Sequence, residues 1–209
     1  MNESAKKFNK LGIIFTIIIT AGFAFGAFAW LNLYKPAVPS IEDIQKNELK
    51  TFLNLQAISR AQNEYKKTDW DNDGKKLYAK YYIHLWKSVS TSGEPIKVGL
   101  ISKKLAFAIE AARAVNGYYF VDLHDTLLAD NQMKSLDYGT QWAVLATKPN
   151  VYQNEMLYFL ADNSGSIFVK YTKYIPLQYI NDPLSNGWTK IDTIQQLQDL
   201  QKKIVYPQS

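Results

Sequence analysis

The hydrophobic pattern begins with an uncharged apolar run from Leu11 to Leu33. A helix needs about 20 apolar residues to cross a bilayer, and this run is long enough. Trp30 and Tyr34 lie at its far end, where aromatic rings prefer the membrane interface, and lysines precede it on the side expected in the cytoplasm. These lysines are Lys6, Lys7 and Lys10. We predict that residues 1–34 form a short cytoplasmic tip and a single transmembrane helix.

Two other kinds of N-terminal segment compete for the same residues. "AFA" at 27–29 fits a signal-peptidase site, but the apolar run continues beyond it, which favours a retained anchor. A prepilin leader requires a glutamate at the fifth position after its glycine, and the residue five positions after Gly12 is Ile17. The standard prepilin signal is therefore absent.

After the Pro-containing linker 35–40, the pattern takes a helical period. Ser40 is a suitable N-cap, and acids follow it where the helix dipole favours them. Residues 41–67 contain no Pro or Gly, and their apolar positions fall on one face. We expect a long amphipathic helix that starts an outer domain of residues 41–209.

The rest of the outer domain is predicted to hold shorter elements. Helices are expected over 77–89, over 102–115 with Asn116–Gly117 as a C-cap, and over 191–204 with Asp192 or Thr193 as N-cap. Segments rich in β-branched and aromatic residues predict strands at 118–123, 141–147, 156–162 and 166–172, the last two joined by a tight turn at "DNSG". Helices followed by antiparallel strands predict an α+β fold, with the long helix on a small sheet.

The composition of the chain excludes several kinds of site and argues against nucleic-acid binding. The chain has no cysteine, which excludes disulfides and thiolate metal sites. Its formal net charge is +5, but the lysines and arginines form no basic stripe with interleaved aromatic residues, and nucleic-acid binding is not expected.

An acidic loop, "DWDNDGK" at 69–75, has the spacing of a calcium loop. Asp69, Asp71 and Asp73 occupy positions 1, 3 and 5, the carbonyl of Lys75 occupies position 7, but Lys80 stands where a bidentate acid belongs. Either Ca²⁺ neutralises the three carboxylates with oxygens from elsewhere, or the loop is solvated among lysines. The residues considered for the extra oxygens are Asp122, Asp125 and Asp162. A bound ion would stabilise the turn after the long helix.

His124 lies between Asp122 and Asp125 and is the one position that suggests acid–base chemistry. With His84 as the only other imidazole, no histidine-rich metal centre is available. No G-x-S-x-G elbow and no phosphate-binding glycine loop is present. A hydrolase using Asp122, His124 and Asp125 is the less favoured interpretation, and no catalytic residue is assigned.

Four segments give the chain a family resemblance. They are "LQAISRAQNEYKKTDWDNDGKKLYAKYY" (55–82), "NGYYF" (116–120), "QWAVLATKPNVYQNEMLYFLADNSGSIFVK" (141–170) and "DPLSNGW" (182–188). Together they resemble the bacterial family called domain of unknown function 2950 and pilin-like exported proteins. The resemblance implies a pilin-like outer domain and calcium at Asp69, Asp71 and Asp73.

From these features we expect a non-enzymatic protein of the bacterial inner membrane, with its C-terminal domain periplasmic or otherwise extracytoplasmic. It would be a structural or accessory subunit of an envelope assembly, with a pseudopilin-like component of a secretion or pilus system as the alternative. Gly22 and Gly26 have G-x-x-x-G spacing, at which membrane helices pack closely. Partner proteins are therefore expected at the anchor and at the outer domain.

Overall fold

A computed structural model of the chain groups its residues into two units, Met1–Pro39 and Ser40–Ser209. It describes residues 39–127, 132–149, 155–174, 179–180 and 182–206. The predicted transmembrane helix, with Gly22 and Gly26, lies outside the described residues. Within the described ranges, no helix combines the length and the apolar composition needed for a membrane crossing.

The longest described element is helix α2, Ile41–Tyr65. The hydroxyl of Ser40 accepts a hydrogen bond from the backbone N–H of Asp43 at 3.1 Å, which confirms the predicted N-cap. The amphipathic helix is also confirmed, although it ends at Tyr65 instead of residue 67. Its buried apolar residues are Phe52, Leu55, Ile58, Ala61 and Tyr65.

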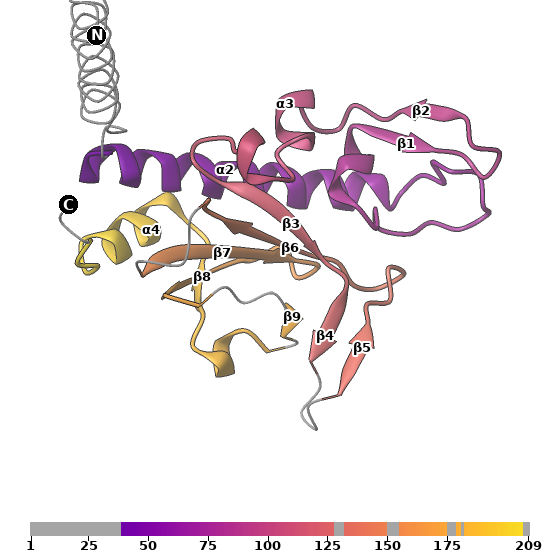
Figure 1. Ribbon diagram of the computed structural model, residues 1–209. Helices are drawn as coiled ribbons and strands as arrows, with labels where there is room; N and C mark the ends of the chain where they lie inside the picture. Colours follow the sequence, from indigo (N-terminus) through magenta and orange to yellow (C-terminus); the bar gives the residue numbers. More distant parts are fainter. Residues whose placement is uncertain (1–38, 128–131, 150–154, 175–178, 181, 207–209) are drawn as a thin grey trace, which may run out of the picture. The chain divides into compact units, whose positions relative to one another are not determined.

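A five-stranded antiparallel sheet forms the centre of the fold, in the order β10-β8-β7-β6-β3. Its strands are β3 (Tyr119–Leu123), β6 (Ala143–Thr147), β7 (Met156–Asp162), β8 (Ile167–Thr172) and β10 (Thr189–Ile191). The predicted tight turn between β7 and β8 is confirmed, since Gly165 N–H donates to the Asp162 carbonyl at 3.0 Å and Gly165 has φ +76°. Helix α2 runs along one face of this sheet (Figure 1).

Both faces of the central sheet are buried. On the helix side, Leu157 and Phe159 belong to the main core together with Phe52 and Leu55 of α2. On the other side, a smaller cluster is built around Leu160, with further residues from several strands and loops. Its other buried members are Leu123, Leu136, Ala143, Leu145, Tyr158, Phe168, Tyr179 and Trp188. The strands of this sheet are therefore almost continuously apolar, as sheets covered on both faces usually are.

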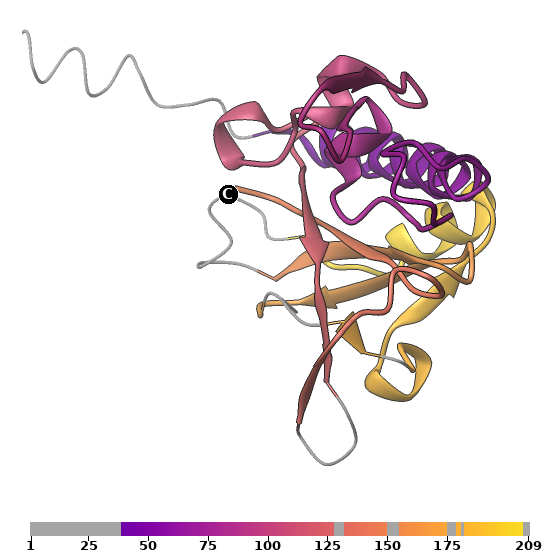
Figure 2. The ribbon, with the colours of Figure 1, turned by 90° about the vertical axis from the view of Figure 1, so that its right-hand side faces the viewer.

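Two small sheets flank the central one. Strands β1 (Lys87–Val89) and β2 (Pro95–Lys97) form an antiparallel pair. Strand β4 (Asp125–Leu127) pairs antiparallel with β5 (Met133–Ser135) and parallel with β9 (Tyr179–Ile180). Figure 2 shows the β4–β5 ribbon extending away from the central sheet.

The remaining helices are short. They are α3 (Lys103–Ala106), α4 (Ile194–Gln201) and the 3₁₀ turns η1 (Tyr82–Leu85), η2 (Ala111–Arg113) and η3 (Leu184–Asn186). For α4, the structure selects Thr193 as N-cap: its hydroxyl accepts from Gln196 N–H, and the Gln196 side chain accepts from Thr193 N–H. This reciprocal capping box makes Asp192 the wrong alternative.

Two predicted helices are wrong. Residues 77–89 form an extended segment, η1 and β1, because Gln62 of α2 uses its side-chain amide to bond both the N–H and the carbonyl of Ala79. The helix expected over 102–115 ends at Ala106, and the carbonyl of Ala108 instead accepts from Phe120 N–H on the edge of β3 at 2.7 Å. Asn116 and Gly117, both at positive φ, form a tight turn that pairs Val115 with Tyr118.

These differences correct the predicted fold class. The α+β, pilin-like domain with an N-terminal transmembrane helix is replaced, for the described residues, by a mostly β fold: a five-stranded sheet, two small sheets and three α-helices. At 77–89 and 102–115, non-local backbone hydrogen bonds override the local helical pattern. Sequence periodicity does not encode such bonds.

Candidate functional site

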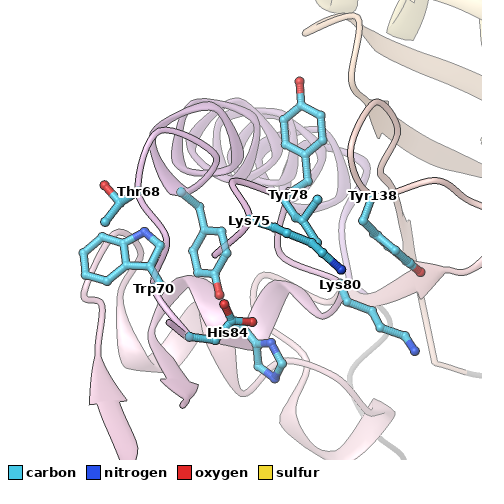
Figure 3. A pocket seen from close by; sticks show the side chains of 10 residues that line it. Thr68, Trp70, Lys75, Tyr78, Lys80, His84 and Tyr138 are labelled. Atoms are coloured by element: carbon cyan, nitrogen blue, oxygen red, sulfur yellow. The ribbon is translucent and has the colours of Figure 1, made fainter. Parts of the chain in front are cut away.

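A pocket of about 260 Å³ lies where the C-terminal end of α2 meets the acidic loop, the segment before η1 and Tyr138. Its lining residues are Tyr65, Thr68, Trp70, Asp71, Lys75, Leu77, Tyr78, Lys80, His84 and Tyr138. Figure 3 shows Thr68 and Trp70 on one side of it, and Lys80 and Tyr138 on the other. Ligand sites in proteins are typically such concave places, apolar with a few polar groups.

Hydrogen bonds to the backbone hold the wall of the pocket in place. The buried amide of Gln62 donates to the Ala79 carbonyl at 3.0 Å and accepts from Ala79 N–H at 2.9 Å. One residue earlier, Tyr78 N–H donates to the Tyr138 carbonyl at 2.9 Å. The wall is thus attached to α2 on one side and to the loop before β6 on the other.

Aromatic rings form much of the pocket surface. Tyr65 and Trp70 stack with ring centroids 6.0 Å apart and an interplanar angle of 28°. The hydroxyl of Tyr65 shares a 3.0 Å hydrogen bond with Ser88, while Nε1 of Trp70 is buried and has no partner among the described residues. An unsatisfied buried donor costs stability. In the described residues seven other buried side-chain atoms, the indole nitrogens of Trp142 and Trp188 among them, share this state.

Apart from its tyrosines, the titratable residues of the pocket are two lysines, an aspartate and a histidine. Within the part of the chain that the structure describes, neither Lys75 nor Lys80 forms an ion pair, and both are exposed. Burial, followed by the nearby charge of Asp73, raises the pKa of Asp71 above its usual range. Burial lowers the pKa of His84, so its imidazole is neutral at pH 7. The pocket therefore offers two lysines without ion-pair partners beside an acid with a raised pKa and an imidazole with a lowered pKa.

The acidic loop brings its three aspartates together. Asp69, Asp71 and Asp73 each offer one oxygen, and these oxygens lie within 4.8 Å of one another. Asp69 also accepts hydrogen bonds from the N–H groups of Asp73 (3.1 Å) and Gly74 (2.9 Å), and Asp73 accepts from Lys75 N–H at 2.7 Å. The side chains thus close the turn themselves, and calcium binding there stays a prediction.

The additional oxygens considered for calcium do not join this group. In the described residues the metal-compatible acidic cluster comprises the three loop aspartates alone. Asp125 accepts from Ser135 Oγ at 2.9 Å, and Asp162 accepts from Tyr179 OH at 3.0 Å. Asp122 accepts from Tyr82 N–H at 2.9 Å. Each of the three is therefore engaged in its own local contact.

Asp122 is the acid with the largest change in its titration. It lies at the end of β3 against η1, and burial raises its pKa to about 7 although the Tyr82 N–H opposes the shift. A carboxyl that titrates near neutral pH is a frequent property of acid–base groups, but structural burial produces it as well.

His124 has a different partner from the one a catalytic triad requires. Its Nδ1 lies 2.7 Å from the hydroxyl of Tyr138, and its ring packs edge-on against Tyr81 at a centroid distance of 5.0 Å. Among the described residues no carboxylate or serine is hydrogen-bonded to His124. Burial lowers its pKa. Tyr138 thus connects His124 to the pocket, which sequence reasoning did not foresee.

Several pocket residues have no recognisable signal in the sequence. Tyr138 lies in the turn 137–140, where Asp137 accepts from the N–H of Gly139, and nothing in "LDYGT" marks its tyrosine as part of a site. Trp70 lies between Asp69 and Asp71, and the calcium-loop spacing is a property of the carboxylates and gives no signal for the tryptophan.

Comparisons with known proteins give no relative to place beside this geometry. No family model matches the chain, and neither a curated protein nor a solved structure is significantly similar to it. The resemblance to domain of unknown function 2950 and to pilin-like proteins stays a prediction.

Proposed function

We propose that this chain is a non-enzymatic binding protein of the bacterial envelope, held at the inner membrane by residues 1–34, with the pocket between α2 and η1 as its working site. The observation that carries the proposal is the pocket itself: stacked aromatic rings, two unpaired lysines and a buried donor without a partner occur together. The residues 1–34 supply the anchor because of their apolar run and the lysines before it.

A binding role fits these residues better than a catalytic one. His84 lines the pocket and His124 is hydrogen-bonded to Tyr138, and within the described residues neither imidazole is hydrogen-bonded to the carboxylate or serine of a catalytic triad. By contrast, aromatic faces and lysines around a cavity supply contact area and charge for a ligand without any reacting group. The accessory role in an envelope assembly would then consist of presenting this pocket outside the membrane.

The test uses the full chain in detergent and a variant that fills the pocket. Thr68 is exposed and lines the pocket, so Thr68→Trp should occlude it; Thr189, exposed on edge strand β10, provides the matched control Thr189→Trp. Ligand-observed NMR would screen single-ring sugars, sugar acids, aromatic acids and short peptides. We expect at least one class to bind the wild type and Thr189→Trp, and to lose binding to Thr68→Trp.

Two results would contradict the proposal. One is that no class distinguishes Thr68→Trp from Thr189→Trp, which would remove the pocket as a binding site. The other concerns the anchor: protease added to spheroplasts should digest residues 41–209 and leave the N-terminal segment with the membrane. A fully protected outer domain would contradict the envelope location.

A further inference from the structure

The pocket is more specific than a general binding cavity, because its lining combines aromatic rings, two lysines and polar side chains. Trp70 stands on one side and Lys80 on the opposite side, with His84 between them in the view of Figure 3. A ligand that uses all three must combine a flat apolar face, a negative charge and several hydroxyl groups.

The size of the pocket limits the ligand. At about 260 Å³ it lies below the ~300–1,000 Å³ of sites for drug-sized molecules. It therefore suits a single substituted six-membered ring. The Trp70 ring, which is partly exposed in the lining and held by its stack on Tyr65, offers such a ring an apolar surface.

The charged side chains of the pocket indicate which charge a ligand should carry. Lys75 and Lys80 make no ion pair within the described ranges, and Nζ of Lys80 lies over the Tyr81 ring, 5.5 Å from its centroid. The lining holds one acid, Asp71, against these two lysines. The excess of positive charge in the lining favours a ligand with a carboxylate.

The polar groups distinguish a sugar from an aromatic acid. Thr68, Asp71 and His84 line the same cavity and offer hydroxyl, carboxyl and imidazole groups. An aromatic acid would leave these groups without partners, whereas ring hydroxyls satisfy them, and leaving polar groups unpaired on binding reduces affinity.

Resting on the binding function proposed above, we propose that the pocket binds a sugar acid, a pyranose ring that carries a carboxylate. The ring lies against Trp70, its carboxylate meets Lys75 and Lys80, and its hydroxyls meet Thr68, Asp71 and His84.

The experiment titrates the full-length protein in detergent with glucuronate, glucose and benzoate, measured by calorimetry and by ligand-observed NMR. We expect glucuronate to bind with a Kd of about 1 mM, a normal value for one ring, and glucose to bind at least about tenfold more weakly. Benzoate should also bind at least about tenfold more weakly than glucuronate, because it cannot pair the polar side.

The lysines are tested by Lys80→Met, with Lys76→Met as the control because Lys76 is exposed and outside the lining. Both lysines are on the surface, so both variants should fold. Glucuronate affinity should fall about tenfold in Lys80→Met and stay unchanged in Lys76→Met.

The outcomes separate this inference from the proposed function. Equal affinity for glucose and glucuronate would overturn the sugar-acid assignment. Tighter binding of benzoate, or an unchanged glucuronate affinity in Lys80→Met, would overturn it as well. In each case Thr68→Trp could still abolish binding of another ligand class. No saturable binding of glucuronate at about 10 mM also overturns it. If no ligand class shows binding that Thr68→Trp abolishes, both the sugar-acid assignment and the proposed binding function are overturned.

Discussion

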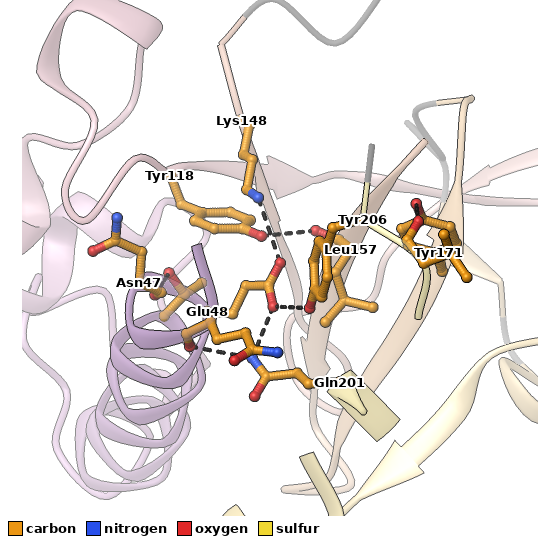
Figure 4. A network of polar contacts seen from close by, with 11 residues as sticks. Asn47, Glu48, Tyr118, Lys148, Leu157, Tyr171, Gln201 and Tyr206 are labelled. Carbon is orange, nitrogen blue, oxygen red and sulfur yellow. Dashed lines mark hydrogen bonds and ion pairs between the residues drawn. The ribbon is translucent and has the colours of Figure 1, made fainter. Parts of the chain in front are cut away.

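Tyr206 donates a 2.7 Å hydrogen bond to Oε2 of Glu48, joining the C-terminal end of the described chain to helix α2. The Glu48 side chain is fully buried and also accepts from Gln201 of α4 at 2.8 Å. Lys148, after β6, lies 3.4 Å from its other oxygen. Figure 4 shows the carboxylate enclosed by these three groups, with Tyr118 beside them. A buried charge is stable only when it is paired and hydrogen-bonded in this way.

Removing this carboxylate should destabilise the domain strongly. Glu48→Ala leaves the ammonium of Lys148 and two donors without their acceptor, and breaking a buried pair typically costs about 3–5 kcal/mol. Glu48→Gln keeps a carbonyl oxygen and should cost less. Urea unfolding of both variants measures the difference, and Glu64→Ala, which removes an exposed ion pair with Lys67, should cost at most about 1 kcal/mol.

A small effect of Glu48→Ala would contradict the dependence of the fold on this network. The double variant Glu48→Ala, Tyr206→Phe provides a check. Because both residues share one hydrogen bond, their effects should be less than additive. Strict additivity would contradict the direct coupling.

Gln62 should be as important to the pocket as to stability. Gln62→Leu keeps a similar volume but leaves the N–H and carbonyl of Ala79 unpaired, and each buried unpaired group costs about 1–3 kcal/mol. The segment with Tyr78 and Lys80 should then loosen. Hydrogen exchange at Ala79 N–H should rise in Gln62→Leu and remain slow in the exposed control Asn63→Ala. Unchanged exchange would show that other contacts hold the segment.

The part of the fold that could be predicted from sequence is the part with sustained periodicity. Helix α2 and strands β3, β6, β7 and β8 lie at the positions that apolar patterns indicated, within a few residues. The two- and three-residue strands, β9 among them, are too short to show a period. Strand β9 also pairs in parallel with β4, far away in sequence. Because such pairing depends on the completed fold, the mostly β class was not visible in the chain.

The site was predictable only as far as one local motif. The spacing of its aspartates identifies the acidic loop in the sequence. The pocket, in contrast, combines Tyr65, Trp70 and Tyr138 from three separate segments. Aromatic residues are common core residues, and their sequence positions do not tell which rings face a cavity. The contact of Tyr138 with His124 required the turn at 137–140 to fold back on β3, which no spacing rule describes.

The acidic loop gives a prediction with a definite sign. Because burial and the Asp73 charge raise the pKa of Asp71, ionised Asp71 is unfavourable in the folded state. Its contribution to stability is full below pH 3.8 and is lost as pH rises through the higher folded-state pKa. In metal-free buffer at pH 7, Asp71→Asn should therefore raise the unfolding free energy, by less than about 1 kcal/mol because the loop is partly solvated.

The same pair of proteins tests the calcium prediction. A site built on the three carboxylates requires Ca²⁺ to raise the melting temperature of the wild type and to have a smaller effect on Asp71→Asn. Asp192→Asn, at an exposed aspartate outside the loop, serves as the control. Equal shifts in all three proteins would exclude calcium at this loop. The loop would then be closed by the hydrogen bonds that Asp69 and Asp73 accept and by the bond from Thr91 N–H to the Asp71 carbonyl.

Asp122 should make stability depend on pH near neutrality. Its folded-state pKa is about 7, whereas the ordinary value is 3.8. The protonated form stabilises the fold below pH 3.8, and this contribution is lost progressively as pH rises to about 7, because the unfolded state releases the proton first. One pKa unit corresponds to about 1.4 kcal/mol, so the rise from 3.8 to about 7 corresponds to a loss of about 4 kcal/mol. Asp122→Asn abolishes the titration while its amide oxygen still accepts from Tyr82 N–H. The unfolding free energy of the variant should match that of the wild type near pH 4 and exceed it by that amount at pH 8, as measured by urea unfolding at each pH.

Asp122→Ala should show the same loss of pH dependence with lower stability throughout, since Tyr82 N–H then has no acceptor. A constant difference between wild type and Asp122→Asn from pH 4 to 8 would show that Asp122 is ionised in the fold, and that the contact of β3 with η1 holds a charged carboxylate.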